Sequence, residues 1–524
     1  MDLEANADSI CALEEQIREH GRTAIRFKRA RNSLLNISKL PPEVLGNIFH
    51  CNTALKDDDF GGLDEGSHNF LLVCHHWFEV ALRTPGIWSF WGNTPKDWAR
   101  WYRRSETAPL DLVLGYGDYE AEDFDTNLRS ALQGRATRDT IRRIHLFNDD
   151  PGLLSSIIAS LTPNSEEVRP NSIESFILQN WSDMPVDLSD FFAHYRFPKL
   201  RHLDLTDCAI SPWDRLTSRT SALTTLHLEL NHPSLAPTTP QLLSIFASNP
   251  ALQKVTLGRC AIPADGDGGE SSSRVQLRHL KGFKSVGDLR HIVRLLHQLD
   301  LPRDMRKLSL YLHGCRTTDV SQVIGPYLRG LLQHRDRPQD GLKVSASSRY
   351  HTRKSCHITL LASDVKGINF SVPAKARVDR FFAITFPPNE MPDRSALEKA
   401  TLDLITYIPR EEVVDFRACN DSIAAVDAWT QFPNLRGLSF DSVPLLTAFP
   451  SPLVEDGKIL PSLDYILLEN VSVNGGDWSP LVAFLTCRLS SGNRLDKLVV
   501  AKSPSMCPEV KEEIRGMVRK LRIV

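Results

Sequence analysis

The chain has 524 residues, of which 41% are hydrophobic and 24% charged, and its formal net charge is −2 with an isoelectric point near 6.8. This balance is typical of an ordinary globular protein and gives no reason to expect binding to nucleic acid or to an anionic membrane. Because the first residues are acidic, where a secretory leader would be basic and then apolar, and because no apolar run is long enough to span a bilayer, we expect a cytoplasmic or nuclear protein.

Residues 1–33 form the first predicted segment, with a helix over residues 7–31. Apolar residues recur at helical spacing, at Ile10, Leu13, Ile17, Ala24 and Phe27. His20-Gly21 interrupts the middle, so we expect at best two short heptad blocks, and a short coiled coil is one candidate structure. The charges are acidic before Gly21 and basic after it. A nuclear-localisation patch is one reading of the basic block, and a solvated helix face is the preferred one.

Residues 34–92 contain two predicted amphipathic helices. Leu40-Pro41-Pro42-Glu43 opens the first, because prolines fit a first helical turn and Glu43 complements the helix dipole. Its apolar face is formed by Val44, Leu45, Ile48 and Phe49. The second is predicted from about His68 to Arg83, with Phe70, Val73, Cys74, Trp77 and Ala81 at helical spacing.

In this order the two segments, followed by Thr84-Pro85-Gly86-Ile87-Trp88, resemble the F-box motif, and are most similar to the large fungal F-box class in which a short basic helix precedes the box. The loop between the helices, roughly 52–67, is longer and more acidic than is usual in that family. The resemblance implies docking onto the Skp adaptor of a cullin–RING ubiquitin ligase, with no catalytic residue in the chain itself. The residues expected to bind the adaptor are Leu40, Pro41, Pro42, Val44, Leu45, Ile48, Phe49, Val73, Cys74, Trp77 and Trp88.

A physical argument supports the same expectation. Two short amphipathic helices present more apolar surface than roughly 50 residues can bury alone, so a partner's helices would complete their core. The alternative is that these helices only cap the core of the next domain.

Residues 93–135 are expected to be a linker helix and a first strand, with the helix at Pro95–Ser105 and the strand at Pro109–Leu114. Trp88, Trp91, Trp98 and Trp101 lie close together in this part of the sequence. An aromatic platform for bases or glycans is conceivable, but packing between the box and the next domain is the preferred interpretation.

Residues 136–524 are predicted to form leucine-rich-repeat-like units. The signature L-x-x-L-x-L-x-x-N/C-x-L is matched completely by Leu200–Ile210 and Leu252–Ile262, and through its asparagine position by Leu223–Asn231. Weaker copies begin at Ile141, Ile173, Met305, Leu435, Leu463 and Leu495. The pattern fades between about 314 and 400, and Pro508–Arg519 is predicted to be a capping helix.

No single repeat can bury its own leucines, so neighbouring repeats must stack. The expected fold is therefore α/β: a short all-α F-box followed by an irregular solenoid, or horseshoe, with a parallel sheet on its concave face. Cys208, Cys260 and Asn231 fall where a side chain should bond to the backbone of the adjacent turn.

The sequence contains no nucleotide-binding loop, nucleophile elbow or H-E-x-x-H motif, and we expect neither an enzyme nor a cofactor. The ten cysteines include no C-x-x-C pair, which favours reduced thiols. In Cys74-His75-His76, adjacent side chains on a helix point about 100° apart and cannot all reach one ion, so no metal site is expected.

The strand positions that flank the buried leucines form the candidate substrate surface. Its residues are His202, Asp204, His227, Glu229, Lys254, Arg259, Lys307, Tyr311, Asp441, Tyr465 and Glu469. Their mixed charge suits a protein or peptide better than a polyphosphate, and the alternative is that they are only the solvated face of a sheet.

Two functions remain open at this point. The first is the substrate-recognition subunit of a Skp–cullin–F-box (SCF) E3 ubiquitin ligase, which binds an unknown target protein. The second is a non-catalytic scaffold that binds the Skp adaptor without directing ubiquitylation.

Overall fold

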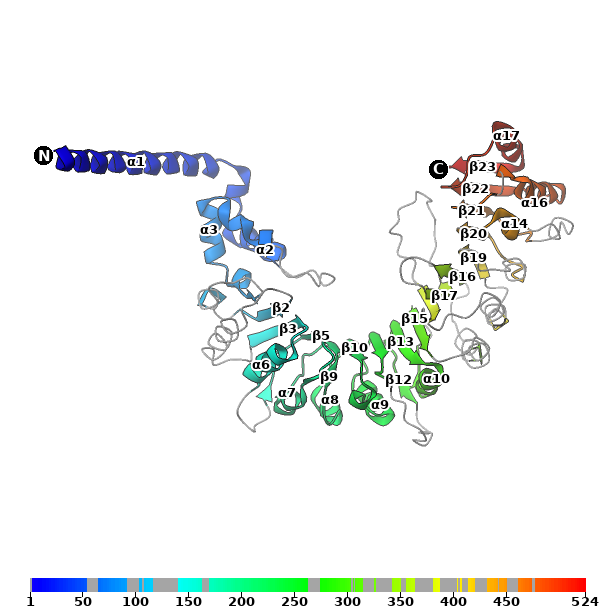
Figure 1. The fold of residues 1–524 in the computed structure, drawn as a ribbon, viewed down its shortest axis with the longest axis horizontal. Coiled ribbons are helices and arrows are strands. Elements are labelled where there is room, and N and C mark those ends of the chain that lie inside the picture. Colours follow the sequence, from blue (N-terminus) through cyan, green and yellow to red (C-terminus); the bar gives the residue numbers. More distant parts are fainter. Residues whose placement is uncertain are drawn as a thin grey trace. The chain divides into compact units, whose positions relative to one another are not determined.

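The structure is a computed structural model of the chain. It describes residues 2–53, 65–91, 103–105, 108–115, 140–162, 169–262, 274–302, 305, 307–313, 325–326, 342–349, 355–362, 380–386, 403, 406–407, 413–419, 431–441, 443–449, 460–473 and 476–524. The chain is mixed α/β, with an N-terminal helical region followed by parallel strands and helices (Figure 1). It divides into two compact units, Met1–Ser221 and Ala222–Val524.

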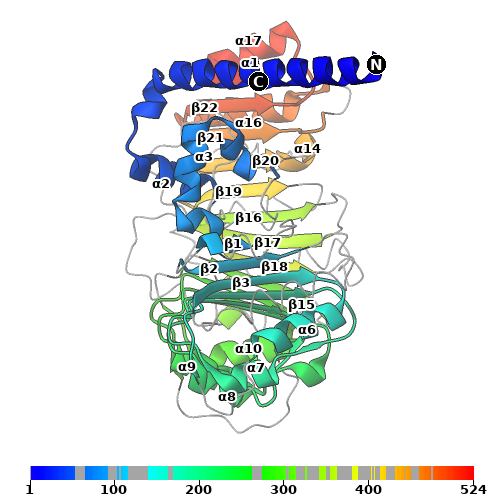
Figure 2. The same ribbon diagram turned by 90° about the vertical axis from the view of Figure 1, so that its left-hand side faces the viewer.

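The N-terminal helical region consists of α-helices and short 3-10 helices. They are α1 (Asp2–Ser33), η1 (Asn36–Lys39), α2 (Pro42–Thr53), η2 (Glu65–Leu72), α3 (His75–Leu82) and η3 (Pro85–Trp88). The predicted helix at 7–31 is confirmed, but its predicted break is wrong, because α1 runs through Gly21 without interruption (Figure 2). A single interior glycine costs a helix only about 1 kcal/mol relative to alanine, which the good helix formers around it offset.

The second predicted helix, His68–Arg83, is wrong as a single element. The chain forms the 3-10 helix η2 and then α3, whose N-cap residue Cys74 has an extended backbone (φ −162°, ψ 167°). The division places Phe70 of η2 and Trp77 of α3 against the same ring, that of Phe49 in α2. Tertiary packing of these rings therefore outweighs the helical periodicity of the sequence.

Parallel strands in the first unit pair in chain order. They are β1 (Phe90–Trp91), β2 (Leu110–Leu114), β3 (Ile141–Asn148), β5 (Ser175–Asn180) and β8 (His202–Thr206). In register, Leu112, Ile144, Phe176 and Leu203 form one row of buried side chains, and a second such row lies two residues further along each strand. Helices α6 (Pro151–Leu161), α7 (Ser189–His194) and α8 (Asp214–Arg219) lie on one side of these strands (Figure 1).

Short strands add two-stranded pairings in the first unit. These are β4 (Arg169–Pro170) with β7 (Tyr195–Arg196), and β6 (Val186–Asp187) with β9 (Cys208–Ala209). The predicted linker helix at Pro95–Ser105 falls largely outside the described residues, whereas the predicted strand at Pro109–Leu114 is confirmed as β2.

The second unit contains a longer run of paired strands. They are β10 (Thr225–Leu230), β11 (Lys254–Arg259), β13 (Gly282–Asp288), β15 (Lys307–His313), β18 (Arg380–Phe386), β17 (Ser355–Ala362), β16 (Leu342–Arg349), β19 (Val413–Cys419), β20 (Gly437–Asp441), β21 (Tyr465–Glu469), β22 (Leu495–Ala501) and β23 (Val518–Ile523), in order of pairing. Figure 2 shows β19 to β22 side by side. The helices are α9 (Thr239–Ser248), α10 (Leu289–His297), α14 (Leu445–Ala448), α16 (Ser479–Ser490) and α17 (Pro508–Met517), with η5 (Pro233–Leu235) and the pair β12 (Val275–Gln276) and β14 (Leu299–Asp300).

Two expectations for this unit need correction. The sheet is not parallel throughout, because β17 pairs antiparallel with both β16 and β18. The short link from β16 to β17 explains their antiparallel pairing, since a parallel neighbour requires a crossover of about a dozen residues. The predicted capping helix ends at Met517, and residues Val518–Ile523 form a last parallel strand against β22.

The strand ends repeat one backbone feature. Asp207, Arg259, Asn470 and Lys502 all have φ between 42° and 51°, a left-handed conformation that is uncommon for residues with side chains. Each directly precedes an equivalent turn residue, at Cys208, Cys260, Val471 and Ser503. The chain therefore leaves these four strands by the same kind of turn.

Candidate partner-binding surfaces

Helices α2 and α3 enclose a small apolar core, here called the helical core. Its buried members are Leu45, Phe49, Phe70, Val80, Ala81, Ile87 and Trp88. The rings of Phe49 and Phe70 stack with centroids 4.4 Å apart. The indole Nε1 of Trp88 donates a hydrogen bond to the carbonyl oxygen of Ala81 at 2.8 Å, so this buried ring has its polar atom satisfied.

The backbone of α2 at Gly46 lies close to the side chain of Thr84, just after α3. A Cβ at Gly46 of α2 would lie 2.9 Å from Oγ1 of Thr84, whose hydroxyl donates to the carbonyl oxygen of Val80 at 2.8 Å. Glycine therefore allows α2 to pack against the end of α3.

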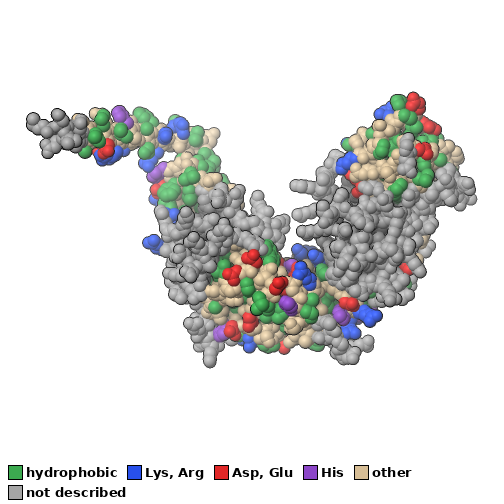
Figure 3. Space-filling model, in the orientation of Figure 1, with side chains coloured by type: hydrophobic (Ala, Val, Ile, Leu, Met, Phe, Trp, Pro, Cys, Tyr) green, Lys and Arg blue, Asp and Glu red, His purple; other side chains and the backbone are tan. Residues whose placement is uncertain are grey.

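The face of α2 adjacent to Leu45 and Phe49 is apolar and exposed. Val44 and Ile48, one helical turn apart, are 43% and 45% exposed. Leu72 and Val73, at the junction of η2 and α3, are 84% and 56% exposed. We call Val44, Ile48, Leu72 and Val73 the exposed apolar set, and Figure 3 shows hydrophobic side chains gathered over the N-terminal helices.

The predicted adaptor-binding residues divide into three groups by burial. Pro41, Pro42, Val44, Ile48 and Val73 are exposed. Leu40, Cys74 and Trp77 are half-buried. Leu45, Phe49 and Trp88 belong to the helical core, where their side chains stabilise the helices themselves.

Sequence reasoning did not include Leu34, Leu35, Ile37 and Leu72, which are all exposed. The adjacent leucines just before the LPPE segment were a usable signal, because consecutive apolar residues outside a helix rarely all face one core.

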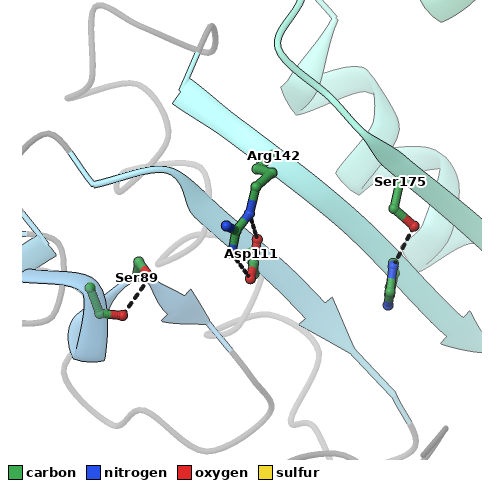
Figure 4. Close-up of polar contacts among 6 residues, drawn as sticks. Ser89, Asp111, Arg142 and Ser175 are labelled. Atoms are coloured by element: carbon green, nitrogen blue, oxygen red, sulfur yellow. Dashed lines mark hydrogen bonds and ion pairs between the residues drawn. The ribbon is translucent and has the colours of Figure 1, made fainter. Parts of the chain in front are cut away.

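The strands of the first unit carry a polar network (Figure 4). Arg142 of β3 donates two hydrogen bonds to the Asp111 carboxylate of β2, at 3.0 and 2.6 Å. The backbone N–H of Asp111 donates to the carbonyl oxygen of Ser89, the residue between η3 and β1, at 2.9 Å. Nε2 of His145 lies 2.9 Å from Oγ of Ser175 on β5.

Burial governs the chemistry of this network. Desolvation, followed by repulsion from His202 and Arg143, lowers the pKa of His145 to about 4, although Asp204 attracts the charged form. At neutral pH His145 is therefore an uncharged hydrogen-bonding partner of Ser175.

An apolar cluster occupies the same strands. It consists of Phe90, Val113, Phe147 and Ile177, each at most 6% exposed. Of the two predicted substrate-surface residues in this unit, His202 is half-buried and Asp204 is only 5% exposed. The ring of His145 lies edge-on to that of Phe147 in this cluster, with the ring centroids 6.4 Å apart.

In the second unit, Glu229 of β10 lies at the centre of a charged group. Its carboxylate is 3.2 Å from Nε of Arg259 on β11 and 3.7 Å from Nε2 of His227. The neighbouring imidazole, together with the charges of Arg259 and Lys284, lowers the pKa of Glu229 despite its partial burial. Lys254, also on β11, is exposed.

Strands β20 and β21 place two more predicted residues, Asp441 and Glu469, in register. Nδ2 of Asn470 donates to Oδ1 of Asp441 at 3.3 Å, and Nζ of Lys502 is 3.2 Å from Oε1 of Glu469. Tyr465 lies in register with Lys497 of β22 and is half-buried. The side chains of Lys307 and Tyr311 lie outside the described part of the structure.

Cys208 and Cys260 each contact the backbone of the neighbouring strand or its turn, as predicted for these two residues. Sγ of Cys208 lies 3.9 Å from the carbonyl oxygen of Leu178, and Sγ of Cys260 lies 3.6 Å from that of Asn231. Burial raises the pKa of the Cys208 thiol, which keeps it protonated as a weak donor. The Asn231 side-chain oxygen accepts a hydrogen bond from the Arg259 guanidinium.

Among the residues described, no three His, Cys, Asp or Glu side chains form a group that could hold a metal ion. Nor is any helix in the described ranges long and apolar enough to cross a membrane. No protein-family model and no curated protein matches this chain.

Proposed function

We propose that this chain is the substrate-recognition subunit of a Skp–cullin–F-box E3 ubiquitin ligase in the cytoplasm or nucleus. In this proposal residues 34–92 are an F-box that docks the Skp adaptor and, through it, a cullin. The remaining chain binds a target protein, and a separate enzyme transfers ubiquitin, so the chain itself has no catalytic residue and needs no cofactor.

The observation that carries the proposal is the division of α2 into two apolar faces. Leu45 and Phe49 close the helical core, while Val44 and Ile48 remain exposed in a segment whose sequence resembles an F-box. Fully burying one such aliphatic side chain contributes about 1.5–3 kcal/mol, so a partner's helices over the exposed apolar set would gain appreciable affinity. An apolar centre of this kind is typical of a protein interface.

We further propose that the strands and helices after the F-box form an irregular leucine-rich-repeat-like solenoid, with the strands on its concave face. Three features support this: the in-register rows of buried leucines, the repeated left-handed turn, and the contacts of Cys208 and Cys260 with the preceding repeat. Each repeat buries its apolar row only against its neighbours, as solenoid repeats do.

The target surface is proposed to include the group His227, Glu229, Lys254 and Arg259 and the group Asp441, Tyr465 and Glu469. The first group mixes charges of opposite sign, whereas the second is acidic and adds an aromatic ring. A protein or peptide with complementary charges fits such a surface better than nucleic acid or a membrane.

A capture experiment with purified Skp adaptor and cullin tests the proposal. The variant Val44→Asp/Ile48→Asp places charges on the exposed face of α2, and Leu446→Asp, at a leucine that is 60% exposed on α14, is the matched control. We expect the unaltered chain and the control to capture both proteins, and the double variant to capture neither.

The other outcomes are equally informative. Capture of the adaptor without cullin would favour a scaffold that does not direct ubiquitylation. If the unaltered chain captures neither protein, residues 34–92 are not an F-box.

A further inference from the structure

Helix α1 exposes a seam of apolar residues with one histidine in its middle. Every side chain from Ser9 to Arg31 is exposed, including those of Ile10, Leu13, Ile17 and Phe27, at 57%, 58%, 70% and 73%. The seam residues, in order, are Ile10, Leu13, Ile17, His20, Ala24 and Phe27. Their spacings alternate between three and four residues, which is the seven-residue repeat of a coiled coil.

Such a helix requires packing that the described part of the chain does not give it. Most helical stability in proteins comes from burying an apolar face, and Gly21 in the middle of α1 weakens the helix further. The two exposed ion pairs that Glu15 makes within α1, with Arg18 at 2.8 Å and Arg22 at 3.6 Å, contribute little in water. A partner along the seam would provide the missing burial.

The charge of α1 indicates which partner fits. Its N-terminal half carries Glu14, Glu15 and Glu19, after Asp2, Glu4 and Asp8 in the sequence. Its C-terminal half carries Arg22, Arg26, Lys28, Arg29 and Arg31. A second copy lying parallel would place like charges beside each other, whereas an antiparallel copy places each acidic half beside a basic half.

The seam has an antiparallel register that uses all of its residues. With Ile17 of one copy opposite His20 of the other, Leu13 meets Ala24 and Ile10 meets Phe27. Two of these layers combine a large side chain with a smaller one, an arrangement that fills a seam without crowding. In each of these layers one copy contributes an a position of the seven-residue repeat and the other copy contributes a d position.

We propose that two copies of this chain associate through α1 as an antiparallel coiled coil. The association does not depend on the function proposed above, because α1 lies outside the helical core and the exposed apolar set. An anionic membrane or a nucleic acid would attract only the basic half of α1, and would leave the acidic half and the seam beside it without a partner.

Sedimentation equilibrium of the full-length chain over a range of concentrations tests the seam. Ile17→Asp changes a seam residue, and Ile25→Asp changes an isoleucine of the same helix that is 50% exposed and lies off the seam. We expect Ile17→Asp to raise the dimer dissociation constant at least about tenfold, because two copies of the lost contact break at once. Ile25→Asp should change it less than about threefold. A chain that is monomeric at every concentration, or equal effects of the two substitutions, would overturn the proposal.

Charge reversal tests the orientation. Glu14→Lys/Glu19→Lys leaves the ion pairs of Glu15 in place but removes most of the net negative charge of the N-terminal half of α1. An antiparallel dimer then loses much of its attraction and should weaken by about tenfold or more at low salt, with a smaller effect at high salt. A parallel dimer would instead lose repulsion between its two acidic halves, so a dissociation constant that stays the same or falls refutes the antiparallel arrangement. Association only with anionic vesicles or with DNA, strengthened by the same substitutions, would refute the proposal as a whole.

Discussion

Arg142 of β3 donates two hydrogen bonds to the carboxylate of Asp111 on β2, from Nε to Oδ1 at 3.0 Å and from a terminal nitrogen to Oδ2 at 2.6 Å. The pairing register shifts at this point: Leu110 faces Ile141, whereas Asp111 faces Arg143. Arg142 is therefore the additional residue of a β-bulge, and the bulge aims its guanidinium at the neighbouring strand. The hydrogen bond to Asp111 raises the pKa of Arg142 against the opposing effect of its burial.

The first prediction concerns this pair. Asp111→Asn keeps the shape of the side chain but removes the charge, and we expect the free energy of unfolding to fall by about 2 kcal/mol, as for hydrogen bonds to charged groups. The control is Asp496→Asn, which disrupts the exposed pair between Asp496 and Arg519 at 3.0 Å and should change stability by less than about 0.5 kcal/mol. Urea unfolding followed by tryptophan fluorescence measures both. Equal losses in the free energy of unfolding would show that burial does not make the Asp111–Arg142 pair more stabilising than an exposed pair.

The second prediction concerns pH. The pKa of His145 in the folded chain is about 4, below the value of about 6.5 expected for the unfolded chain. The unfolded state therefore binds more protons between these values, and stability present above pH 6.5 is lost as the pH falls towards 4. The loss from this one group is about 3 kcal/mol.

Unfolding of the unaltered chain and of His145→Gln at pH 7 and pH 4.5 measures the effect. Other groups also lose stability in acid, so the expected result is a smaller difference between the two pH values in His145→Gln than in the unaltered chain. His279→Gln replaces an exposed histidine and is the matched control. If all three proteins respond alike, His145 does not carry the effect.

The leucine spacing predicted several of the strands correctly, including β8, β10 and β11. In β10 the residues from Thr225 to Leu230 alternate between half-buried and buried, as the leucine spacing predicts. The same alternation gave a wrong prediction for Asp204, because its side chain was expected on a solvent-exposed face and is only 5% exposed. Phe90, Val113, Phe147 and Ile177 form an apolar cluster on these strands, so the strands are buried on both faces. The unbroken run Phe176-Ile177-Leu178 was a signal of that burial.

The N-terminal helices show a different limit. The residues Val44, Leu45, Ile48 and Phe49 occupy two adjacent faces of α2, and helical periodicity does not tell which face is internal. The packing of Phe70 and Trp77 on Phe49 shows that the face with Leu45 and Phe49 is the internal one. That packing depends on the division between η2 and α3, which no local pattern in the sequence indicates.

The third prediction tests this division of α2. Leu45 is fully buried and Val44 is 43% exposed, although they are neighbours in the sequence. Leu45→Asp should destabilise the helical core by about 4 kcal/mol or more, because it removes packing and buries a charge. Val44→Asp should change stability by less than about 0.5 kcal/mol. Thermal unfolding and limited proteolysis at residues 34–92 distinguish them, and comparable losses in the two variants would place Val44 in the core.

The last prediction concerns Glu229 and Gly258, which are in register on β10 and β11. The Glu229 side chain lies across Gly258, where a Cβ would come within 2.9 Å of Cγ and 3.0 Å of Cβ of the glutamate. Gly258→Ala should therefore push Glu229 away from Arg259 and His227 and cost about 1–2 kcal/mol. Gly287→Ala is the matched control, because a Cβ there would meet its nearest neighbour, the carbonyl oxygen of Arg259, at an ordinary 3.6 Å.

A double-mutant cycle isolates the contact. In a Glu229→Ala background the space above Gly258 is vacant, so Gly258→Ala should cost about 1 kcal/mol less than it does beside the glutamate. Strict additivity of the two substitutions in urea unfolding would mean that Glu229 does not rest on Gly258. The ion pair with Arg259 would then need another explanation. Arg259 is the last residue of β11, and the Glu229 carboxylate reaches its guanidinium because the glutamate side chain crosses that strand at Gly258.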